Sequence, residues 1–180
     1  MEVDPIRNRE DVEKIKEVAK GRNKILLEIG FNTGLRVSDL LKLKVKDIFD
    51  YQHVNLQEQK TKKNRKVSLN PKVKEIVKNY IDDNGLETDD YLYQSRKGDN
   101  EPISKVQAYR IMNKLAKKAG LNEKIGTHTL RKSFGYHHYQ QYKDMAQLQY
   151  IFNHSSVETT KRYIGLTQEN VDKSIEGFYL

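Results

Sequence analysis

Thr127-His128-Thr129-Leu130-Arg131 is the stretch around which this 180-residue chain is organised. Its spacing of three residues places His128 and Arg131 on the same side of a helix when both lie near the helix start. A helix start also favours a bound anion, because its first backbone N–H groups have no partner within the helix. A His-x-x-Arg pair by itself is common on protein surfaces, so its meaning depends on the rest of the chain.

Three further motifs supply residues of the same kinds. Asn153-His154-Ser155-Ser156 precedes Tyr163, Thr33-Gly34-Leu35-Arg36 lies near the start of the chain, and Lys60 lies between. Arginines, histidines, a lysine and a tyrosine are the groups that cleavage of a phosphodiester by a tyrosine nucleophile requires. Taken alone, a tyrosine near a C-terminus more often packs its ring into the core and forms a hydrogen bond through its hydroxyl.

The composition favours one folded domain, comprising residues 1–180, with a strongly charged surface. Hydrophobic residues make up 36% of the chain and charged residues 32%, yet apolar residues recur along nearly its whole length, which argues against disorder. The formal net charge of +8 indicates an acidic partner, with nucleic acid favoured over a membrane surface. A basic protein with no polyanionic partner remains an alternative on charge alone.

The sequence also predicts a cytoplasmic protein that does not bind a membrane. The chain has no cysteine, which excludes disulfides and thiolate metal sites. The acidic start Met1-Glu2-Val3-Asp4-Pro5 lacks the apolar segment of a signal peptide. No apolar run approaches the roughly 18 residues that a membrane span needs.

Hydrophobic periodicity predicts a mainly α fold with a small antiparallel β-sheet (α+β). We expect helices at about 8–21, 25–32, 71–85, 104–120, 128–142, 145–152, 157–163 and 169–175. Ser38 is expected to cap a further short helix after Arg36. Residues 86–102 are expected to form a loop with a short strand at Tyr91–Tyr93.

Residues 45–69 change to an alternating pattern, which predicts a hairpin. Val54 and Leu56 alternate with polar residues on the first strand, as do Val67 and Leu69 on the second. The polar tip expected between them contains the cations Lys60, Lys62, Lys63, Arg65 and Lys66. Such a run is either a solvated loop or a cationic finger that reaches a phosphate backbone, and the latter makes Lys62, Lys63, Arg65 and Lys66 candidate DNA-binding residues.

Taken together and in this order, the motifs resemble those of the tyrosine recombinase, or phage integrase, family. The matching residues are Arg36, Lys60, His128, Arg131, His154 and Tyr163. The resemblance covers residues 8–175 and implies the fold of the family's catalytic domain, with double-stranded DNA as its substrate.

The resemblance implies that Tyr163 attacks the scissile phosphate and forms a 3′-phosphotyrosyl link. Arg36 and Arg131 would bind the non-bridging oxygens, because a planar guanidinium matches a phosphate and stays charged. His154 would donate a further hydrogen bond to the phosphate. No metal or other cofactor is expected.

The remaining roles concern proton transfer and support. His128 would assist proton transfer at the tyrosine, and Lys60 would protonate the leaving 5′-oxygen. Lys62 and Lys63 remain alternatives for that lysine, because a hairpin one residue longer or shorter would change the choice. Asp39 matches an acidic position that supports the active-site arginines and histidine in the family.

The resemblance implies a site-specific recombinase of a mobile genetic element, which cleaves and rejoins DNA through a Holliday junction. It would act as a homotetramer on DNA and exist as a monomer in solution. A DNA-relaxing enzyme similar to type IB topoisomerases is one alternative. A DNA-binding regulator of the same fold without catalysis is the other.

The chain differs from most integrases in having no expected N-terminal core-binding domain, since the catalytic pattern begins near residue 8. Either a naturally short protein or a fragment explains this difference. After Tyr163, the apolar residues Phe178, Tyr179 and Leu180 end the chain. They are expected to cover the core of their own subunit or to dock on a neighbouring protomer, and the sequence leaves both open.

Overall fold

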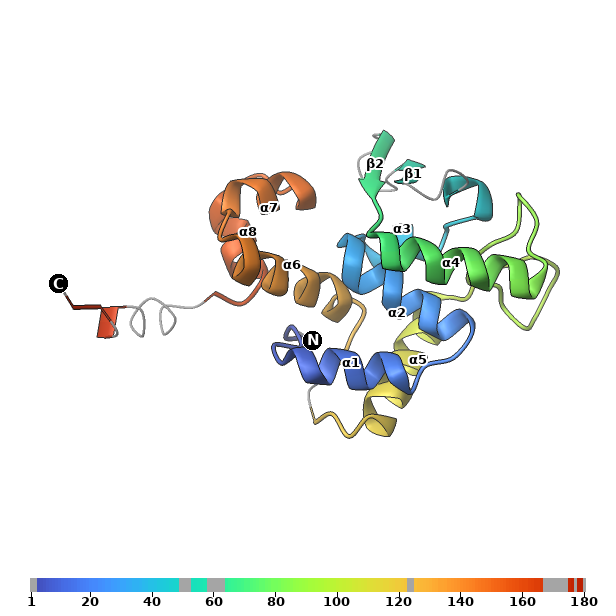
Figure 1. Ribbon diagram of the computed structural model, residues 1–180, viewed down its shortest axis with the longest axis horizontal. Helices are drawn as coiled ribbons and strands as arrows, with labels where there is room; N and C mark the ends of the chain where they lie inside the picture. The colour runs from blue at the N-terminus through green and yellow to red at the C-terminus, as the bar shows by residue number, and fades with distance from the viewer. Residues whose placement is uncertain are drawn as a thin grey trace.

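The computed structural model describes residues 3–48, 53–57, 64–122, 125–166, 175–176 and 178–179 (Figure 1). Its elements are α1 (Arg9–Glu17), α2 (Arg22–Thr33), α3 (Val37–Leu40), the 3₁₀ helix η1 (Val45–Ile48), β1 (His53–Gln57), β2 (Asn64–Ser68), α4 (Pro71–Asn84), α5 (Lys105–Lys118), α6 (Thr129–Tyr142), α7 (Met145–Phe152) and α8 (Val157–Tyr163). The prediction of a mainly α fold with a small antiparallel sheet is confirmed. The helix expected at 169–175 lies, apart from Ile175, outside the described residues.

Local capping chemistry explains where most helices begin. The side chain of Asn8 accepts from the Glu10 N–H at the start of α1, and that of Asn70 accepts from the Lys72 N–H at the start of α4. Ser104 and Gln107 form a reciprocal capping box at the start of α5. These starts agree with the predictions.

The expected cap at Ser38 is wrong. Gly34 ends α2 in the left-handed region, with φ 62°, and the backbone of Arg36 is extended. The short helix α3 therefore begins at Val37, so that Ser38 lies inside it and Arg36 takes the N-cap position. This places Arg36 at the bend between two helices, where the residue is partly buried.

The main core surrounds α2. Leu26, Leu27 and Ile29 are fully buried in it, and α2 contacts α1, α3, α4 and α6. Gly30 lets α6 approach closely, because a Cβ at that position would lie 2.6 Å from Cδ1 of Leu130. The first turns of α6 are thereby fixed against the most buried helix of the domain.

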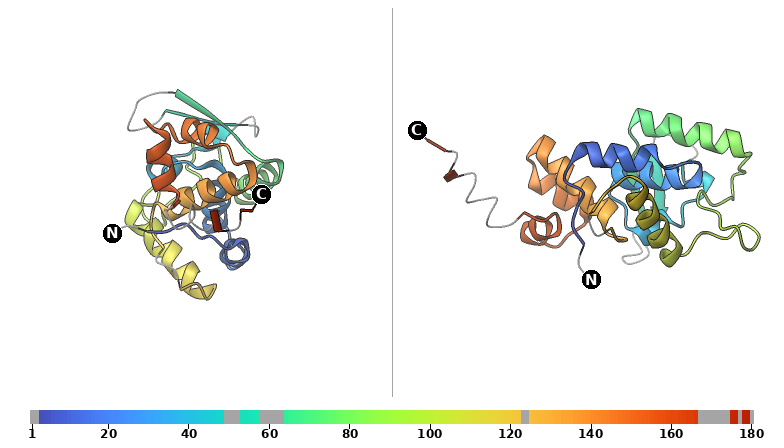
Figure 2. Two further views of the ribbon diagram at one scale, coloured as in Figure 1. Left: turned by 90° about the vertical axis from the view of Figure 1, so that its left-hand side faces the viewer. Right: turned by 90° about the horizontal axis from the view of Figure 1, so that it is seen from below.

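A second, smaller cluster lies at the other end of α6, where α7 and α8 are found (Figures 1 and 2). Its buried residues are Leu148, Phe152 and Ile164. Gly135 of α6 allows this close packing, since a Cβ there would lie 2.6 Å from Cζ of Phe152 and 2.7 Å from Cγ2 of Ile164. Thus α6 connects the main core to the helix that ends at Tyr163.

The N-terminal residues pack along α6 (Figure 2). The N–H of Ile6 donates to Oγ of Ser133 at 2.8 Å, and Nε2 of His137 lies 2.9 Å from the Ile6 carbonyl. Gly165, two residues after Tyr163, lies beside Arg7 of this segment. The start of the chain therefore contacts both α6 and the end of α8.

The hairpin pairs β1 with β2 antiparallel, with Val54 opposite Val67 and Leu56 opposite Arg65. The expected tip from Lys60 to Lys66 is too long, because β2 begins at Asn64 and includes Arg65 and Lys66. Backbone pairing continues to the register of Gln57 with Asn64, which explains the longer strand. The tip residues Lys60, Lys62 and Lys63 lie outside the described part of the chain.

The short strand expected at Tyr91–Tyr93 is replaced by isolated bridges, from Lys44 to Tyr91 and from Gln94 to Pro102. The N–H of Leu92 donates to the Leu43 carbonyl at 2.9 Å. Single pairings of this kind satisfy backbone N–H and C=O groups without forming a continuous ladder.

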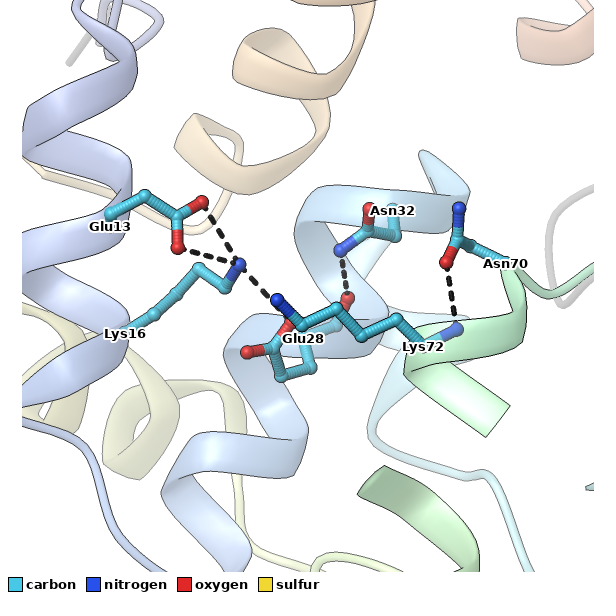
Figure 3. A network of polar contacts seen from close by, with 6 residues as sticks. All are labelled: Glu13, Lys16, Glu28, Asn32, Asn70 and Lys72. Atoms are coloured by element: carbon cyan, nitrogen blue, oxygen red, sulfur yellow. Dashed lines mark hydrogen bonds and ion pairs between the residues drawn. The ribbon is translucent and has the colours of Figure 1, made fainter. Parts of the chain in front are cut away.

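A polar network joins α1 to the buried face of α2 (Figure 3). Nζ of Lys16 lies 3.3 Å from Oε2 of Glu28 and 3.2 Å from Oε1 of Glu13. The Glu28 side chain is only 7% exposed, so the lysine compensates a carboxylate that burial would otherwise penalise. Nδ2 of Asn32 donates to the Glu28 carbonyl at 2.8 Å. Asn70, at the start of α4, lies beside the network (Figure 3).

Gly135→Ala is expected to lower the free energy of unfolding by about 1–3 kcal/mol, the usual cost of overpacking. The added methyl would overlap the ring of Phe152 and displace the cluster under Tyr163. Urea unfolding followed by circular dichroism measures the change. Gln141→Ala on the exposed face of α6 is the control and should leave stability nearly unchanged; equal effects of both substitutions would contradict the close-packing account.

Candidate active site

Arg131 is the most buried charged group of the site, with 3% of the residue exposed. Its guanidinium donates to the carbonyl of Gly34, at the end of α2, and to that of Phe152, at the end of α7, at 2.8 Å. Both carbonyls belong to helix ends, where the last C=O groups have no partner within the helix. The arginine therefore fixes the relative positions of the α2–α3 turn, α6 and α7.

Aromatic rings surround the same guanidinium. Cζ of Arg131 lies 4.3 Å from the ring centroid of Phe152 and 5.9 Å from that of Tyr163. These distances are within the range of cation–π contacts. The charge is thus placed directly beside the tyrosine ring.

Tyr163 lies at the end of α8 with its hydroxyl 3.2 Å from Nδ1 of His128. Its ring meets those of His154 and Phe152 edge-on, at centroid distances of 5.1 and 5.5 Å. Burial raises the pKa of the phenol, while the charges of Arg131 and Arg36 and a hydrogen bond from Arg131 oppose that rise. The phenol is therefore protonated at neutral pH and needs a base in order to become a nucleophile.

His128 lies within hydrogen-bond distance of that hydroxyl. It occupies the N-cap position of α6. Its pKa is lowered by partial burial and then by the positive charges of Lys132, Arg131 and Lys105. The imidazole is accordingly neutral at pH 7, and in the tautomer with its proton on Nε2, Nδ1 accepts a hydrogen bond from the Tyr163 hydroxyl.

His154 follows Asn153, whose left-handed backbone (φ 50°) ends α7. Its Nδ1 lies 3.1 Å from Oγ1 of Thr160, whose hydroxyl is also 3.2 Å from the Ser156 carbonyl. Burial, followed by the charges of Arg131 and Arg36, lowers its pKa to about 4. The imidazole is therefore neutral and oriented by Thr160, next to two arginines that attract an anion.

The structure brings some of the predicted site residues together and places others apart from them. Arg131, His128, His154 and Tyr163 form one contiguous group, and the charge of Arg36 acts on both His154 and Tyr163. Asp39 is buried in α3, at the edge of a pocket that also includes Lys42, Asp47 and Leu56.

The basic residues of the hairpin are only partly placed. Lys66 is exposed on β2, and Arg65 belongs to the same strand. Lys60, Lys62 and Lys63 lie outside the described residues. Within the described part of the chain, no three acidic or histidine side chains group closely enough to bind a metal ion, and no helix there is long and apolar enough to span a membrane.

Sequence reasoning missed Lys132 and the role of Phe152. Lys132 is only 7% exposed, and its Nζ lies 5.5 Å from the ring centroid of Tyr163. Phe152 contributes both its ring and its carbonyl to the position of Arg131. The sequence did contain a signal for Lys132, because this residue follows His128 by one helical turn. Nothing in the sequence indicates the role of the Phe152 backbone carbonyl.

The fold and the grouping of a tyrosine with two histidines and a buried arginine define the class of tyrosine site-specific recombinases. The model of the phage integrase family matches residues 8–170, and the chain belongs to that family.

Two relatives illustrate the similarity in sequence. The chain is 42% identical over 179 residues to the probable integrase/recombinase YoeC of Bacillus subtilis, covering 98% of this chain and 97% of YoeC. It is 32% identical over 174 residues to the tyrosine recombinase XerA of Pyrococcus furiosus, covering 93% of this chain. The chain spans 59% of the length of that XerA.

Solved structures share the fold. A crystal structure of XerA recombinase superposes with a TM-score of 0.81 at 24% identity, over 100% of this chain and 66% of that one. The catalytic domain of bacteriophage HP1 integrase superposes with a TM-score of 0.64 at 20% identity, over 98% and 95% of the two chains.

An NMR titration of the His154 ring is expected to give a midpoint of about 4 in the folded protein. A midpoint at the ordinary value near 6.5 would contradict the partial burial of this ring and the effect of the two arginine charges on it. Arg36→Gln removes one of those positive charges and should raise the midpoint relative to the wild type. Arg162→Gln on the exposed side of α8 serves as the control, and should leave it unchanged.

Proposed function

We propose that the protein cleaves and rejoins double-stranded DNA with Tyr163 as the nucleophile. The observation that carries the proposal is the 3.2 Å contact between the Tyr163 hydroxyl and Nδ1 of His128, beside the buried Arg131. The phenol oxygen forms a bond to phosphorus as the bond from phosphorus to the 5′-oxygen breaks. A phosphotyrosyl link on the 3′ side and a free 5′-hydroxyl result, and the reverse reaction rejoins a strand without an external energy source.

The first proton transfer takes place between Tyr163 and His128. The neutral imidazole accepts the phenol proton as the phosphorus–oxygen bond forms, which removes the need for a free phenolate. General base catalysis of this kind contributes typically about 10²–10⁴-fold to a rate. The lowered pKa of His128 supports its role, because it leaves the acceptor nitrogen unprotonated at neutral pH.

The two arginines stabilise the charge that develops on the phosphate. Arg131 is held by two carbonyls before the substrate arrives, so little reorganisation is needed in the transition state. Arg36 lies in the α2–α3 turn, and its charge opposes the rise in the pKa of Tyr163. Asp39, buried in the helix that follows Arg36, supports this turn in the proposal.

His154 acts as a further hydrogen-bond donor to the phosphate. In the DNA-free protein, burial and then the charges of Arg131 and Arg36 lower its pKa. A bound phosphate offsets those charges and therefore favours protonation of the ring. Nδ1 remains directed at Thr160, and Nε2–H then donates to a non-bridging oxygen.

Lys60 protonates the leaving 5′-oxygen in this mechanism, with Lys62 and Lys63 as the alternatives in the same hairpin. A lysine near the tip of a hairpin can close on DNA after binding. Lys62, Lys63, Arg65 and Lys66 would bind the DNA backbone, and the exposed position of Lys66 supports this. Each phosphate neutralised adds about −0.9 to the slope of log K against log salt.

The partner is proposed to be double-stranded DNA, bound at a specific site by a homotetramer that passes through a Holliday junction. The net charge of +8 supports a polyanionic partner. Two structural neighbours were solved on DNA: XerH with its difH substrate and lambda integrase with a COC′ core site. Residues 1–180 would act in this assembly as one catalytic domain, monomeric in the absence of DNA.

Trapping on a nicked duplex tests the nucleophile. The nick lets the short 5′-hydroxyl product diffuse away, so a covalent protein–DNA band accumulates on denaturing gels. The wild type is expected to form this band on duplexes made from the junctions of its own genetic element, and Tyr163→Phe should form none. Tyr150→Phe removes a hydroxyl from a residue that is 87% exposed on α7, and should retain full activity.

The outcomes separate the competing functions. A band from the wild type on specific junctions only, together with strand exchange between two duplexes, establishes recombination. Equal bands on any duplex with relaxation of supercoiled plasmid would indicate an enzyme similar to type IB topoisomerases. DNA binding without a band would indicate a regulator and overturn the proposal.

A further inference from the structure

Lys132 is an unusual residue in this fold, because its side chain is charged and yet nearly buried. It lies in the second turn of α6, immediately after Arg131, with 7% of the residue exposed. Burial of an ammonium is costly unless its charge interacts with something that compensates it. The mechanism described above does not use this group.

Lys132 lies beside Tyr163 and one helical turn from His128, the two partners of the first proton transfer. Its Nζ lies 5.5 Å from the ring centroid of Tyr163, within the range of a cation–π contact. Its backbone N–H donates to the His128 carbonyl at 2.8 Å, so the two side chains are one helical turn apart on α6. The hydroxyl of that tyrosine and the ring of that histidine are in turn 3.2 Å apart.

We propose that Lys132 is a positioning residue of the cleavage reaction, which fixes the Tyr163 ring against His128 and places a positive charge one helical turn from that imidazole. The inference rests on the proposed function of Tyr163 and His128. It adds a residue whose effect on the reaction passes through these two side chains.

The charges around His128 determine how strongly Lys132 can act. The groups that face this imidazole are Arg131 and Lys132 from α6, Lys105 from α5 and the Tyr163 hydroxyl from α8. Lys132 has the largest effect among these cations. A bound phosphate offsets Arg131, which contacts it directly in the proposed mechanism, whereas the charge of Lys132 remains directed at the Tyr163 ring.

We expect the charge of Lys132 to extend the pH range of cleavage toward more acidic solution. His128 must be unprotonated to take the proton from the Tyr163 oxygen as that oxygen attacks phosphorus. A fixed positive charge beside His128 keeps it unprotonated in more acidic solution, so the acid limb of the rate profile lies at lower pH than it would otherwise. The same ammonium restricts the ring, so the hydroxyl stays within reach of Nδ1.

Three variants separate charge from packing. Lys132→Met keeps the length and apolar stem of the side chain without its charge, and Lys132→Arg keeps the charge. Lys143→Met is the matched control, because Nζ of Lys143 lies 5.4 Å from the ring centroid of Tyr139 at the far end of α6. The control removes a lysine–tyrosine contact of the same kind away from the site.

Single-turnover cleavage of the nicked duplex is measured for each variant between pH 5 and 9. Lys132→Met is expected to lower the plateau rate by about threefold to thirtyfold, as loss of a cation–π contact implies, and to move the acid midpoint to higher pH. Lys132→Arg should restore the midpoint, and Lys143→Met should behave as the wild type. A slower Lys132→Met enzyme with an unchanged midpoint would mean that Lys132 only packs, and would overturn the inference.

An NMR titration of His128 without DNA gives a readout that does not depend on activity. Its midpoint should rise in Lys132→Met relative to the wild type and stay unchanged in Lys143→Met. Should Lys132→Met fail to fold, Lys132→Gln replaces it in both measurements. An unchanged His128 midpoint refutes the role of Lys132 even when cleavage occurs, whereas a wild type that forms no covalent complex refutes the proposed function itself.

Discussion

The guanidinium of Arg131 is the interaction on which the rest of the site depends. It binds the carbonyls of Gly34 and Phe152, which lie far apart in the sequence and at the ends of different helices. Removing the guanidinium would leave two buried carbonyls without a partner, a cost of about 1–3 kcal/mol for each. The same group therefore closes the fold and, in the proposed mechanism, supplies the charge that binds a phosphate, so a substitution there would affect both stability and chemistry.

Burial and nearby positive charge together keep the two histidines neutral. Arg131 acts on both rings, with Arg36 at His154 and Lys132 at His128, and each effect lowers a pKa. In the proposed mechanism, a bound phosphate adds negative charge beside these cations. Its binding would partly offset the effect of those cations on the two rings.

Much of this arrangement could be predicted from the sequence, because caps, periodicity and residue order are local signals. Asn8, Asn70 and Ser104 fixed helix starts correctly, and the order of His128, Arg131, His154 and Tyr163 predicted a group that does come together. The failures have a common cause. Ser38, the extent of β2, and the carbonyl partners of Arg131 depend on backbone conformation and on contacts between distant segments, which residue types alone do not specify.

The division of the apolar residues into two clusters has a consequence for how the protein loses activity on heating. The helix that ends at Tyr163 rests on the small cluster of Leu148, Phe152 and Ile164, whereas α2 is enclosed by the much larger one. Fewer buried contacts mean a lower free energy of local opening. We therefore expect the end of the molecule that contains Tyr163 to open before the body unfolds, so that inactivation on warming is a local event that precedes global melting.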